Sequence, residues 1–416
     1  MTFKFIHMAD VHIDTAFKSK DKRLRRILRD AVYESFKRAA DEAIARKADA
    51  VLIAGDLFDS DTLSFTAEKM MINEMERLCR AEIDVYYAPG NHDPCGGDFA
   101  LRDIKWPSNV HIFNSHKSTS YEIRDDKGEI KAVVVGAGHE SKKEVRDIVK
   151  NFPYAKGDVP YVGLVHTYVA GEKNYSGHEK YAPCSLEDLK SKGYTYWAIG
   201  HIHAREKLCE EPLIVYPGNI AGRNIKETGL KGVYYVEIRS RHDVKCEFLP
   251  VAPLLWEELD INNLDLYNSL SDIENKIYIS IRQYMDSLDY SGKLLLRVNL
   301  AGQCKLYGEL QDEDNVSEME ESLKESLGME YIDISTGKLT KYVDIKSYYN
   351  EPHVLGETLR LIERLKNDDS LLLHISPDLS LPAPDASKDK KIEYLKELLC
   401  NMEYDAASRL IKEDGK

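Results

Sequence analysis

Short apolar runs alternate with longer amphipathic stretches over the first 250 residues, as buried strands alternate with helices in an α/β protein. The runs predicted to be strands are residues 4–8, 50–54, 85–88, 133–135, 162–165, 197–199 and 213–216. Stretches with helical spacing of apolar residues are 24–46, 67–80 and 186–192. This order of elements predicts a layered α/β sandwich over residues 1–250.

The pattern changes after Pro250 and Pro253, which predicts a domain boundary. Residues 251–345 are expected to form a small α/β domain, with strands at 294–299 and 331–334 and a helix over 263–284. The acidic stretch 311–321 between these strands is typical of a solvated helix face.

Residues 346–416 have a helical pattern and are expected to form a third region. The segment 376–389 contains three prolines and is predicted to be a linker between helices. Beyond it we expect one last helix, because five apolar residues recur at steps of three and four and form one stripe: Ile392, Leu395, Leu399, Met402 and Ala406.

Composition narrows the class of protein. With 43% hydrophobic and 31% charged residues, and no apolar run near the roughly 18 residues that cross a bilayer, a cytoplasmic globular protein is expected. The net charge of −14 arises after residue 250, where 19 Lys and Arg face 33 Asp and Glu, against 38 of each before it. A nucleic acid would therefore be repelled by the second part of the chain but not by the first.

The cysteine pattern and the absence of a nucleotide-binding loop argue against three further classes of protein: disulfide-bonded, zinc-binding and P-loop proteins. Seven scattered cysteines without a CxxC pair predict reduced thiols, not disulfides or a zinc site. The sequence contains no GxxxxGK[ST] motif, so no P-loop for ATP is expected.

Five short polar motifs follow directly after apolar runs. They are DVH at 10–12, GDLFD at 55–59, GNHD at 90–93, a histidine at 166 and GHIH at 200–203. Because ligand-binding groups gather where strands of an open α/β sheet end, we expect the motifs to converge on one crevice. A DxH or GDxxD motif alone is weak evidence, whereas five motifs in this order are not readily explained by chance. Histidines outside the motifs, at 7, 111, 116, 139, 178, 242, 353 and 374, are expected on the surface or in the core.

The residue types in these motifs suit two divalent metal ions. Asp10 and His12 are two residues apart, so they are expected to reach one ion from one face of an extended segment, and His201 and His203 repeat this spacing. Asp56 is the natural carboxylate to bridge the ions. Imidazole, carboxylate and amide ligands together favour manganese, iron or zinc over magnesium or calcium.

In this order the motifs resemble the calcineurin-like metallophosphoesterase superfamily, and within it the SbcD and Mre-type DNA repair nucleases, the bacterial YhaO-like branch in particular. The resemblance covers about residues 1–240. It implies a β-sandwich flanked by helices, in α/β/β/α layers, followed by a small α/β cap domain and C-terminal helices.

The resemblance also implies roles for the motif residues. One metal would be held by Asp10, His12, Asp56 and His203, and the other by Asp56, Asn91, His166 and His201, with manganese favoured. His92 would face the scissile phosphate as a catalytic residue, and Asp93 would keep its imidazole charged and oriented. The implied reaction is the hydrolysis of DNA phosphodiesters, by exonuclease or endonuclease action in DNA repair, with a metal-activated water.

Two further residues would contact the substrate in such a nuclease. Asp59 fits the SbcD-like form of the second motif, and Arg223 lies in the segment that closes the nuclease domain. Serine is more usual where Asn219 stands. The basic run within residues 18–29 is either a phosphate contact or a solvated helix start.

The implied partners are DNA and an SbcC-like or YhaN-like coiled-coil ATPase, for which the last helix and the acidic tail are candidate docking elements. Packing of that helix on its own domain is the alternative. Apolar side chains between residues 63 and 78 would form either a homodimer face or ordinary core.

Two other functions use the same motifs. The centre could serve a phosphatase or a cyclic-nucleotide phosphodiesterase that acts on a small substrate. Protein phosphatases of the superfamily have GNHE and an arginine after the second motif, whereas this chain has GNHD and Ser60, which favours the nuclease. A non-catalytic binding subunit would be expected to have lost ligands, and all seven are present.

Overall fold

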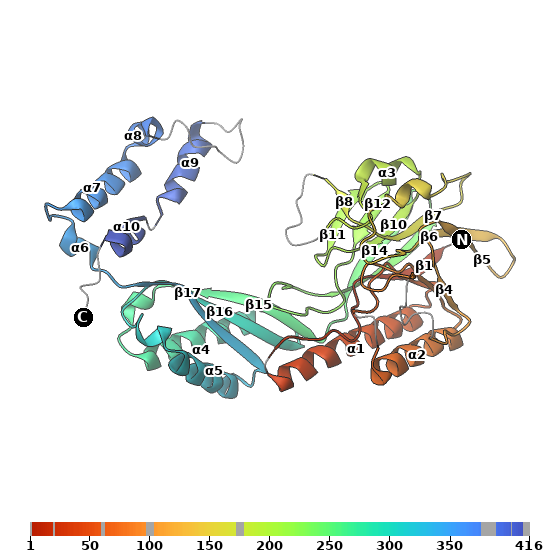
Figure 1. Cartoon of the computed structure of the whole chain (residues 1–416), viewed down its shortest axis with the longest axis horizontal. Coiled ribbons are helices and arrows are strands. Elements are labelled where there is room, and N and C mark those ends of the chain that lie inside the picture. The colour runs from red at the N-terminus through yellow and green to blue at the C-terminus, as the bar shows by residue number, and fades with distance from the viewer. Residues whose placement is uncertain are drawn as a thin grey trace. The chain divides into compact units, whose positions relative to one another are not determined.

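The chain forms two compact units in the computed structural model (Figure 1), which describes residues 2–19, 21–59, 63–96, 104–171, 179–375, 388–400 and 402–410. The first unit consists of Met1–Glu257 with Ser291–Leu295, and the second of Glu258–Tyr290 with Leu296–Lys416. Ser60 and residues 376–387 of the predicted linker lie outside the described residues. Within the described ranges, no helix has both the length and the apolar character to cross a membrane.

Two six-stranded sheets form the first unit. One has the order β14 (Asp243–Pro250), β13 (Gly232–Ser240), β1 (Phe3–Met8), β2 (Ala50–Ile53), β3 (Asp84–Tyr87) and β4 (Val110–Ile112). The other has the order β11 (Glu206–Glu210), β12 (Leu213–Tyr216), β10 (Tyr196–Gly200), β7 (Tyr161–His166), β6 (Ile130–Ala137) and β5 (Thr119–Arg124). A short pair, β8 (Val169–Ala170) and β9 (Cys184–Ser185), lies outside both sheets.

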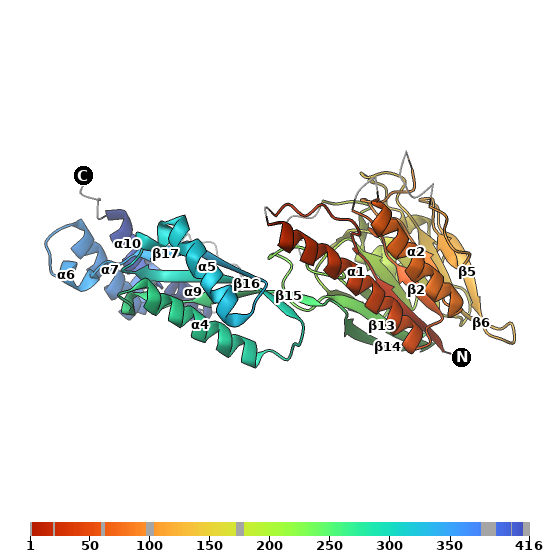
Figure 2. The same cartoon turned by 90° about the horizontal axis from the view of Figure 1, so that it is seen from below.

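Three apolar layers hold these sheets between helices. Phe5 and Leu52 from the first sheet pack with Leu164 and other buried side chains of the second. The opposite face of the first sheet packs on the long helices α1 (Lys22–Ala45) and α2 (Phe65–Arg80), which lie beside it in Figure 2. The outer face of the second sheet, which includes Trp197, packs on the short helix α3 (Leu186–Ser191). The predicted α/β/β/α sandwich is therefore confirmed.

The parallel strands in each sheet end at the same level. Ile53 at the end of β2 pairs with Met8 of β1 and with Tyr87 of β3. In the other sheet, Gly200 at the end of β10 pairs with His166 at the end of β7. The loops after these five strands therefore leave from the carboxyl edges of their sheets.

The described residues of the second unit contain seven α-helices and most of a three-stranded sheet, whose first two strands along the chain begin in the first unit. The sheet has the order β15 (Leu254–Ile261), β16 (Lys293–Cys304) and β17 (Tyr331–Lys341), and α4 (Leu270–Ser287) contacts α5 (Glu313–Leu327). The helix predicted over 263–284 begins later, because Ser269 caps it by accepting a hydrogen bond from the backbone of Asp272. The acidic stretch coincides with α5, which buries only Met319 and Leu323.

The remaining helices are α6 (Ile345–Tyr348), α7 (Val354–Asn367), α8 (Asp369–His374), α9 (Lys388–Leu398) and α10 (Met402–Leu410). The prediction of one last helix is wrong, since the apolar stripe is divided between α9 and α10. Leu395 and Leu399 pack in a cluster with Leu365, whereas Ala407 packs in a separate cluster with Leu359. Leu395 and Leu399 are therefore buried within their own unit, whereas Met402 of the same stripe is 44% exposed.

Candidate metal centre

The five motifs lie where the fold brings strand ends together. Asp10 and His12 follow β1, Asp56 follows β2, Asn91 follows β3, His166 ends β7, and His201 and His203 follow β10. All of these side chains except that of His203 are buried, and His203 is 20% exposed. The structure therefore brings all seven predicted ligand residues to one buried place, while their role as ligands stays a prediction.

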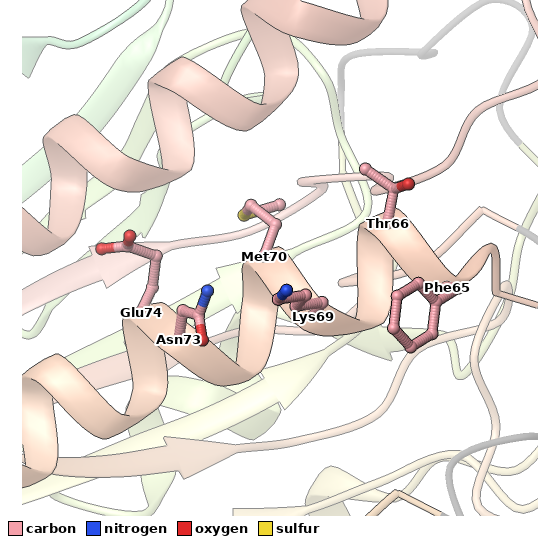
Figure 3. A pocket seen from close by; sticks show the side chains of 6 residues that line it. All are labelled: Phe65, Thr66, Lys69, Met70, Asn73 and Glu74. Atoms are coloured by element: carbon pink, nitrogen blue, oxygen red, sulfur yellow. The ribbon is translucent and has the colours of Figure 1, made fainter.

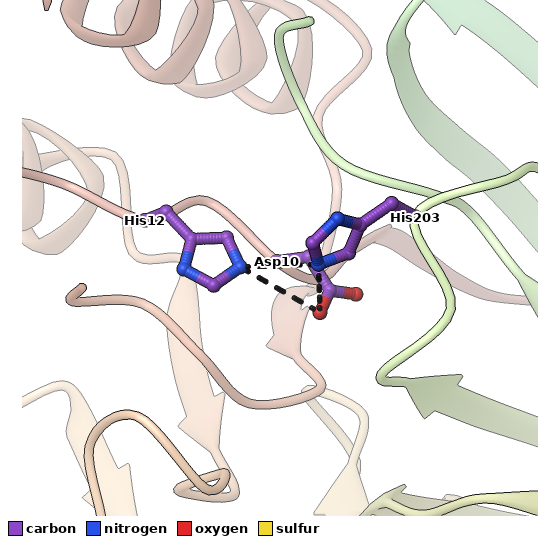
Figure 4. Close-up of side chains that lie close together, drawn as sticks. All are labelled: Asp10, His12 and His203. Atoms are coloured by element: carbon purple, nitrogen blue, oxygen red, sulfur yellow. Dashed lines mark hydrogen bonds and ion pairs between the residues drawn. The ribbon is translucent and has the colours of Figure 1, made fainter. Parts of the chain in front are cut away.

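Asp10, His12 and His203 form one group, in which the two rings and the carboxylate point toward one another (Figure 4). Oδ1 of Asp10 lies 4.0 Å from Nε2 of His12 and 3.7 Å from Nε2 of His203. The two Nε2 atoms are 3.4 Å apart. These spacings leave room for one ion to bind all three atoms.

Asn91, His166 and His201 form a second group. Oδ1 of Asn91 lies 3.0 Å from Nε2 of His166 and 3.3 Å from Nδ1 of His201. Asp56 lies between the groups, because its Oδ2 is 3.9 Å from Nε2 of His12 and 3.4 Å from Nε2 of His166. Its other oxygen accepts a hydrogen bond from the backbone of His92 at 2.8 Å.

The backbone reaches this geometry in a way that the sequence did not suggest. Asp10, His12, Asp56 and His201 have φ values of 50°, 52°, 50° and 115°, so none of them continues an extended strand. The expectation that Asp10 and His12 share one face of an extended segment is wrong. The chain turns sharply after β1, and left-handed backbone at both residues directs the side chains to one point.

The chemistry of the donor set fits divalent cations. Nδ1 of His166 lies 2.9 Å from the carbonyl oxygen of Ala54, which can only accept, so Nδ1 carries the proton and Nε2 has a lone pair facing Asn91. Oδ1 of Asp10 is a buried carboxylate oxygen without a hydrogen-bond partner among the described residues. Acceptors that face one another in a buried site are stabilised by a cation between them.

Burial changes the ionisation of these groups in the direction that such a cation would offset. It raises the pKa of Asp10 to about 7 and lowers the pKa values of His12 and His166 well below their ordinary value. Neutral imidazoles are the form that binds metals. A cation beside Asp10 would favour its carboxylate form.

The glycines of the motifs are needed because the motif loops touch one another. A Cβ on Gly55 would overlap the ring of His166, and one on Gly90 would overlap the carboxylate of Asp56. Gly200 lies against the carbonyl oxygen of Ala54. Of these three, only Gly55 has a positive φ, so close approach of the loops and not backbone conformation explains the glycines at 90 and 200.

His92 lies beside the centre, with its ring centroid 4.9 Å from that of His12 and its side chain 42% exposed. Its Nδ1 lies 3.3 Å from the carbonyl oxygen of Asp59 and 3.5 Å from the carboxylate of the same residue. Asp93, expected to orient His92, is fully buried and accepts hydrogen bonds from the backbone of Asp56, Phe58 and Gly90 and from the Tyr87 hydroxyl. Asp93 therefore joins two motif loops, and Asp59 is the residue that holds His92.

Asp59 and Arg223 were expected to contact substrate, but they have partners within the protein. Oδ1 of Asp59 lies 2.9 Å from Nδ1 of His12 and 3.3 Å from Nη1 of Arg223. Their side chains are 19% and 17% exposed. This pairing favours the orientation of ligands over contact with substrate.

Glu227 has a similar position, although no role was predicted for it. Its Oε1 lies 2.9 Å from Nδ1 of His203, and its Oε2 accepts a hydrogen bond from Nδ2 of the buried Asn219 at 2.8 Å. Burial alone would raise its pKa, but the hydrogen bond with His203 and the charge of Arg223 outweigh burial and lower it strongly. The signal available in the sequence was only the position of Glu227 four residues after Arg223.

The centre opens into a cleft of about 940 Å³. Asp56, Asn91, His92, His201 and His203 form its floor. The exposed cations Arg205 and Lys226 lie on its rim, and the buried Lys231 and the acidic Glu179 and Glu227 also line it. Nζ of Lys231 donates to the backbone oxygen of His203 at 3.2 Å. A phosphate that approached the floor would therefore pass cationic side chains.

The two-sheet sandwich with paired acceptor groups at its strand ends is the arrangement of a metal-dependent phosphoesterase. Residues 3–205 match the calcineurin-like phosphoesterase family, so the chain contains a calcineurin-like metallophosphoesterase domain. Domains of this fold use divalent metal ions, and the ligand groups described above are candidates to hold them.

Three known proteins are similar to parts of this chain. The chain is 33% identical to YhaO, a metallophosphoesterase of Bacillus subtilis, over 268 aligned residues. This alignment covers 64% of each chain. It is 27% identical to the DNA double-strand break repair protein Mre11 of Aeropyrum pernix over 297 aligned residues. This alignment covers 67% of this chain and 69% of that protein. A dimetal phosphatase from Danio rerio aligns over 59% of this chain and 98% of its own, with 12% identity and a TM-score of 0.36. The chain thus spans slightly less than two thirds of the length of YhaO.

Proposed function

We propose that this protein is a two-metal phosphodiesterase that hydrolyses DNA, as the nuclease subunit of a complex with a coiled-coil ATPase of the SbcC or YhaN kind. One observation carries the proposal. Two ligand groups share Asp56 at the floor of a cleft, and the side chain of His92, 42% exposed, lies beside them close to His12 and Asp56. Relatives named as DNA double-strand break repair proteins support DNA as the substrate.

Each group at the floor would have a defined task. Two bound ions would supply an activated water and offset negative charge on the phosphoryl oxygens. Asp56 fixes the spacing of the two positions. Nδ1 of His92 donates to the carbonyl oxygen of Asp59, so its Nε2, when protonated, is free of that bond and can donate to the leaving oxygen.

The distribution of cations supports a long polyanion over a small phosphoester. Besides the rim of the cleft, Lys22, Arg25, Arg26 and Arg29 line a hollow of about 400 Å³ together with Thr15. The Thr15 hydroxyl donates to the backbone oxygen of His12 at 2.8 Å, which links this hollow to the centre. A single phosphate needs only the floor, whereas a nucleic acid is held by further phosphate contacts.

Exposed apolar side chains support the proposed protein partners. On the C-terminal helices Val354, Leu361 and Leu398 are 69%, 47% and 49% exposed, which suits the docking of the ATPase. On α2, Phe65 is 78% exposed and lines a shallow pocket with Met70 (Figure 3), which suits a homodimer face. Met71, Met75 and Leu78 of the predicted face are instead buried in the core.

A direct assay tests the nuclease. Purified protein with Mn²⁺ is incubated with linear double-stranded DNA, single-stranded DNA and a phosphomonoester, with and without the ATPase, beside His92→Ala and Asn91→Ala. We expect DNA cleavage that both substitutions abolish. His116→Ala is the control, since its ring pairs with Glu140 outside the centre. Cleavage of the monoester with DNA left intact would instead identify a phosphatase.

A further inference from the structure

The two halves of the centre differ in what holds their imidazoles. Carboxylates flank one half. Asp59 Oδ1 lies 2.9 Å from Nδ1 of His12 as a close ion-pair contact without hydrogen-bond geometry, and Glu227 Oε1 forms a hydrogen bond of 2.9 Å with Nδ1 of His203. Backbone oxygens hold the other half, where Ala54 O lies 2.9 Å from Nδ1 of His166 and Glu179 O lies 2.6 Å from Nε2 of His201. A carboxylate partner makes an imidazole a stronger metal ligand and fixes its orientation.

Arg223 joins the two carboxylates of the first half. Its Nη1 lies 3.3 Å from Asp59 Oδ1, and its Nη2 lies 3.4 Å from Glu227 Oε1. Its backbone N–H donates to Glu227 Oε2 at 2.7 Å. One planar guanidinium therefore fixes both the carboxylate bonded to His203 and the carboxylate that lies against His12.

The first half also contains more negative charge. It has the carboxylate of Asp10 beside the shared Asp56, where the second half has the neutral amide of Asn91. Asp59 and Glu227, with one guanidinium between them, add one net negative charge near the same half. Ligand charge and ligand orientation both favour binding of a divalent cation there.

We propose that the two metal positions fill in order, first at Asp10, His12 and His203, and that Arg223 is the positioning residue that makes this position the tighter one. The proposal rests on the ligand set of the proposed function. It assigns Arg223 to the metal centre and not to the substrate.

Removal of Arg223 separates this role from a simple charge effect. If only its charge mattered, Arg223→Gln would strengthen cation binding. If Arg223 acts by holding Asp59 and Glu227, the same substitution lowers the affinity of the tighter position by roughly 10- to 100-fold. Arg223→Lys keeps the charge but lacks the fork, so it recovers only part of the loss. Lys226→Gln, which removes an exposed cation from the rim, is the matched control and leaves both affinities unchanged.

The measurement is a calorimetric titration of the metal-free full chain with Mn²⁺, with electron paramagnetic resonance spectra of the same samples. We expect two resolved steps, isolated Mn²⁺ at one equivalent and a spin-coupled pair only at two. Asn91→Ala removes the weaker step, and Asp10→Ala removes the tighter one. If circular dichroism shows that Arg223→Gln is unfolded, Glu227→Gln replaces it, because it keeps an oxygen for His203 but loses the charge that Arg223 binds.

Each outcome has one meaning. Two equal affinities, with coupled pairs already present at one equivalent, overturn ordered filling but leave the centre and the proposed function intact. No Mn²⁺ binding by the folded protein refutes the ligand set and the proposed function with it. Binding by Arg223→Gln that is unchanged or tighter overturns the positioning role.

Discussion

The floor and the rim of the cleft are built from different kinds of residue. On the floor, Asp56 and Asn91 are almost fully buried, and the backbone N–H of His92 donates a hydrogen bond that holds the Asp56 carboxylate. On the rim, Lys226 is exposed, and Arg205 lies over the ring of Phe248. The difference indicates that the floor determines the chemistry and the rim determines which phosphoesters are retained.

The largest effect expected on the floor comes from Asp56→Asn. The variant keeps the shape of the side chain but removes the charge that both metal positions share. We expect turnover to fall by roughly 10³-fold or more, because metal ions stabilise the transition state by several kcal/mol. The measurement is kcat on linear DNA, with metal content by mass spectrometry. Retention of two Mn²⁺ and of near-normal turnover would contradict the bridging position of Asp56.

His92→Ala separates chemistry from metal binding within the floor. We expect kcat to fall by about 10²- to 10⁴-fold, the usual contribution of a general acid or base, while Mn²⁺ stoichiometry stays at the wild-type value. Kinetics and calorimetry on one preparation provide both readouts. Loss of Mn²⁺ together with turnover would show that His92 supports the ions instead of the leaving group.

Tyr87→Phe tests the layer beneath the floor. The Tyr87 hydroxyl donates to the buried carboxylate of Asp93, which holds the loops after β2 and β3. Loss of this bond is expected to lower the free energy of unfolding by about 1 to 3 kcal/mol, measured by urea denaturation. Tyr154→Phe is the control, since Tyr154 is 65% exposed. Equal stability of the two variants would mean that Asp93 does not depend on this donor.

Substitutions on the rim are expected to have the smallest effect. Arg205→Gln and Lys226→Gln should raise KM for DNA a few-fold and leave kcat unchanged. Each lost phosphate contact should also reduce the slope of log affinity against log salt by about 0.9 for duplex DNA. An unchanged slope would place the path of the DNA elsewhere, for example at the hollow beside Thr15.

The sandwich could be predicted from the sequence because its central strands are apolar on both faces. In β2, for example, Leu52 faces one apolar layer and Ile53 faces the other, so the strand appears in the sequence as an unbroken apolar run. It predicted where the motifs meet because strand ends in parallel register share one edge. It did not predict β13, which pairs antiparallel with β1 from more than 200 residues away. No local pattern indicates which strands such a distant strand will pair with.

The partners of the ligands were missed for the same physical reason. Asp59 contacts Arg223 across 164 positions in the sequence, and this pairing depends on the closed sandwich. The prediction of one uninterrupted last helix was wrong for a different reason, because it relied on local spacing alone. This spacing was correct for an apolar stripe, but Leu399 and Ala406 have different neighbours in the fold.

The left-handed backbone conformation of Asp10, His12, Asp56 and His201 affects how stable the metal-free protein is in the cell. Such conformations cost about 1 to 3 kcal/mol each, which is a large share of the total stability of an ordinary domain. A ligand that binds only the native state stabilises it and so offsets this cost. We therefore expect chains synthesised under manganese starvation to be degraded faster by cellular proteases, so that nutrient supply would set the abundance of this protein as well as its activity.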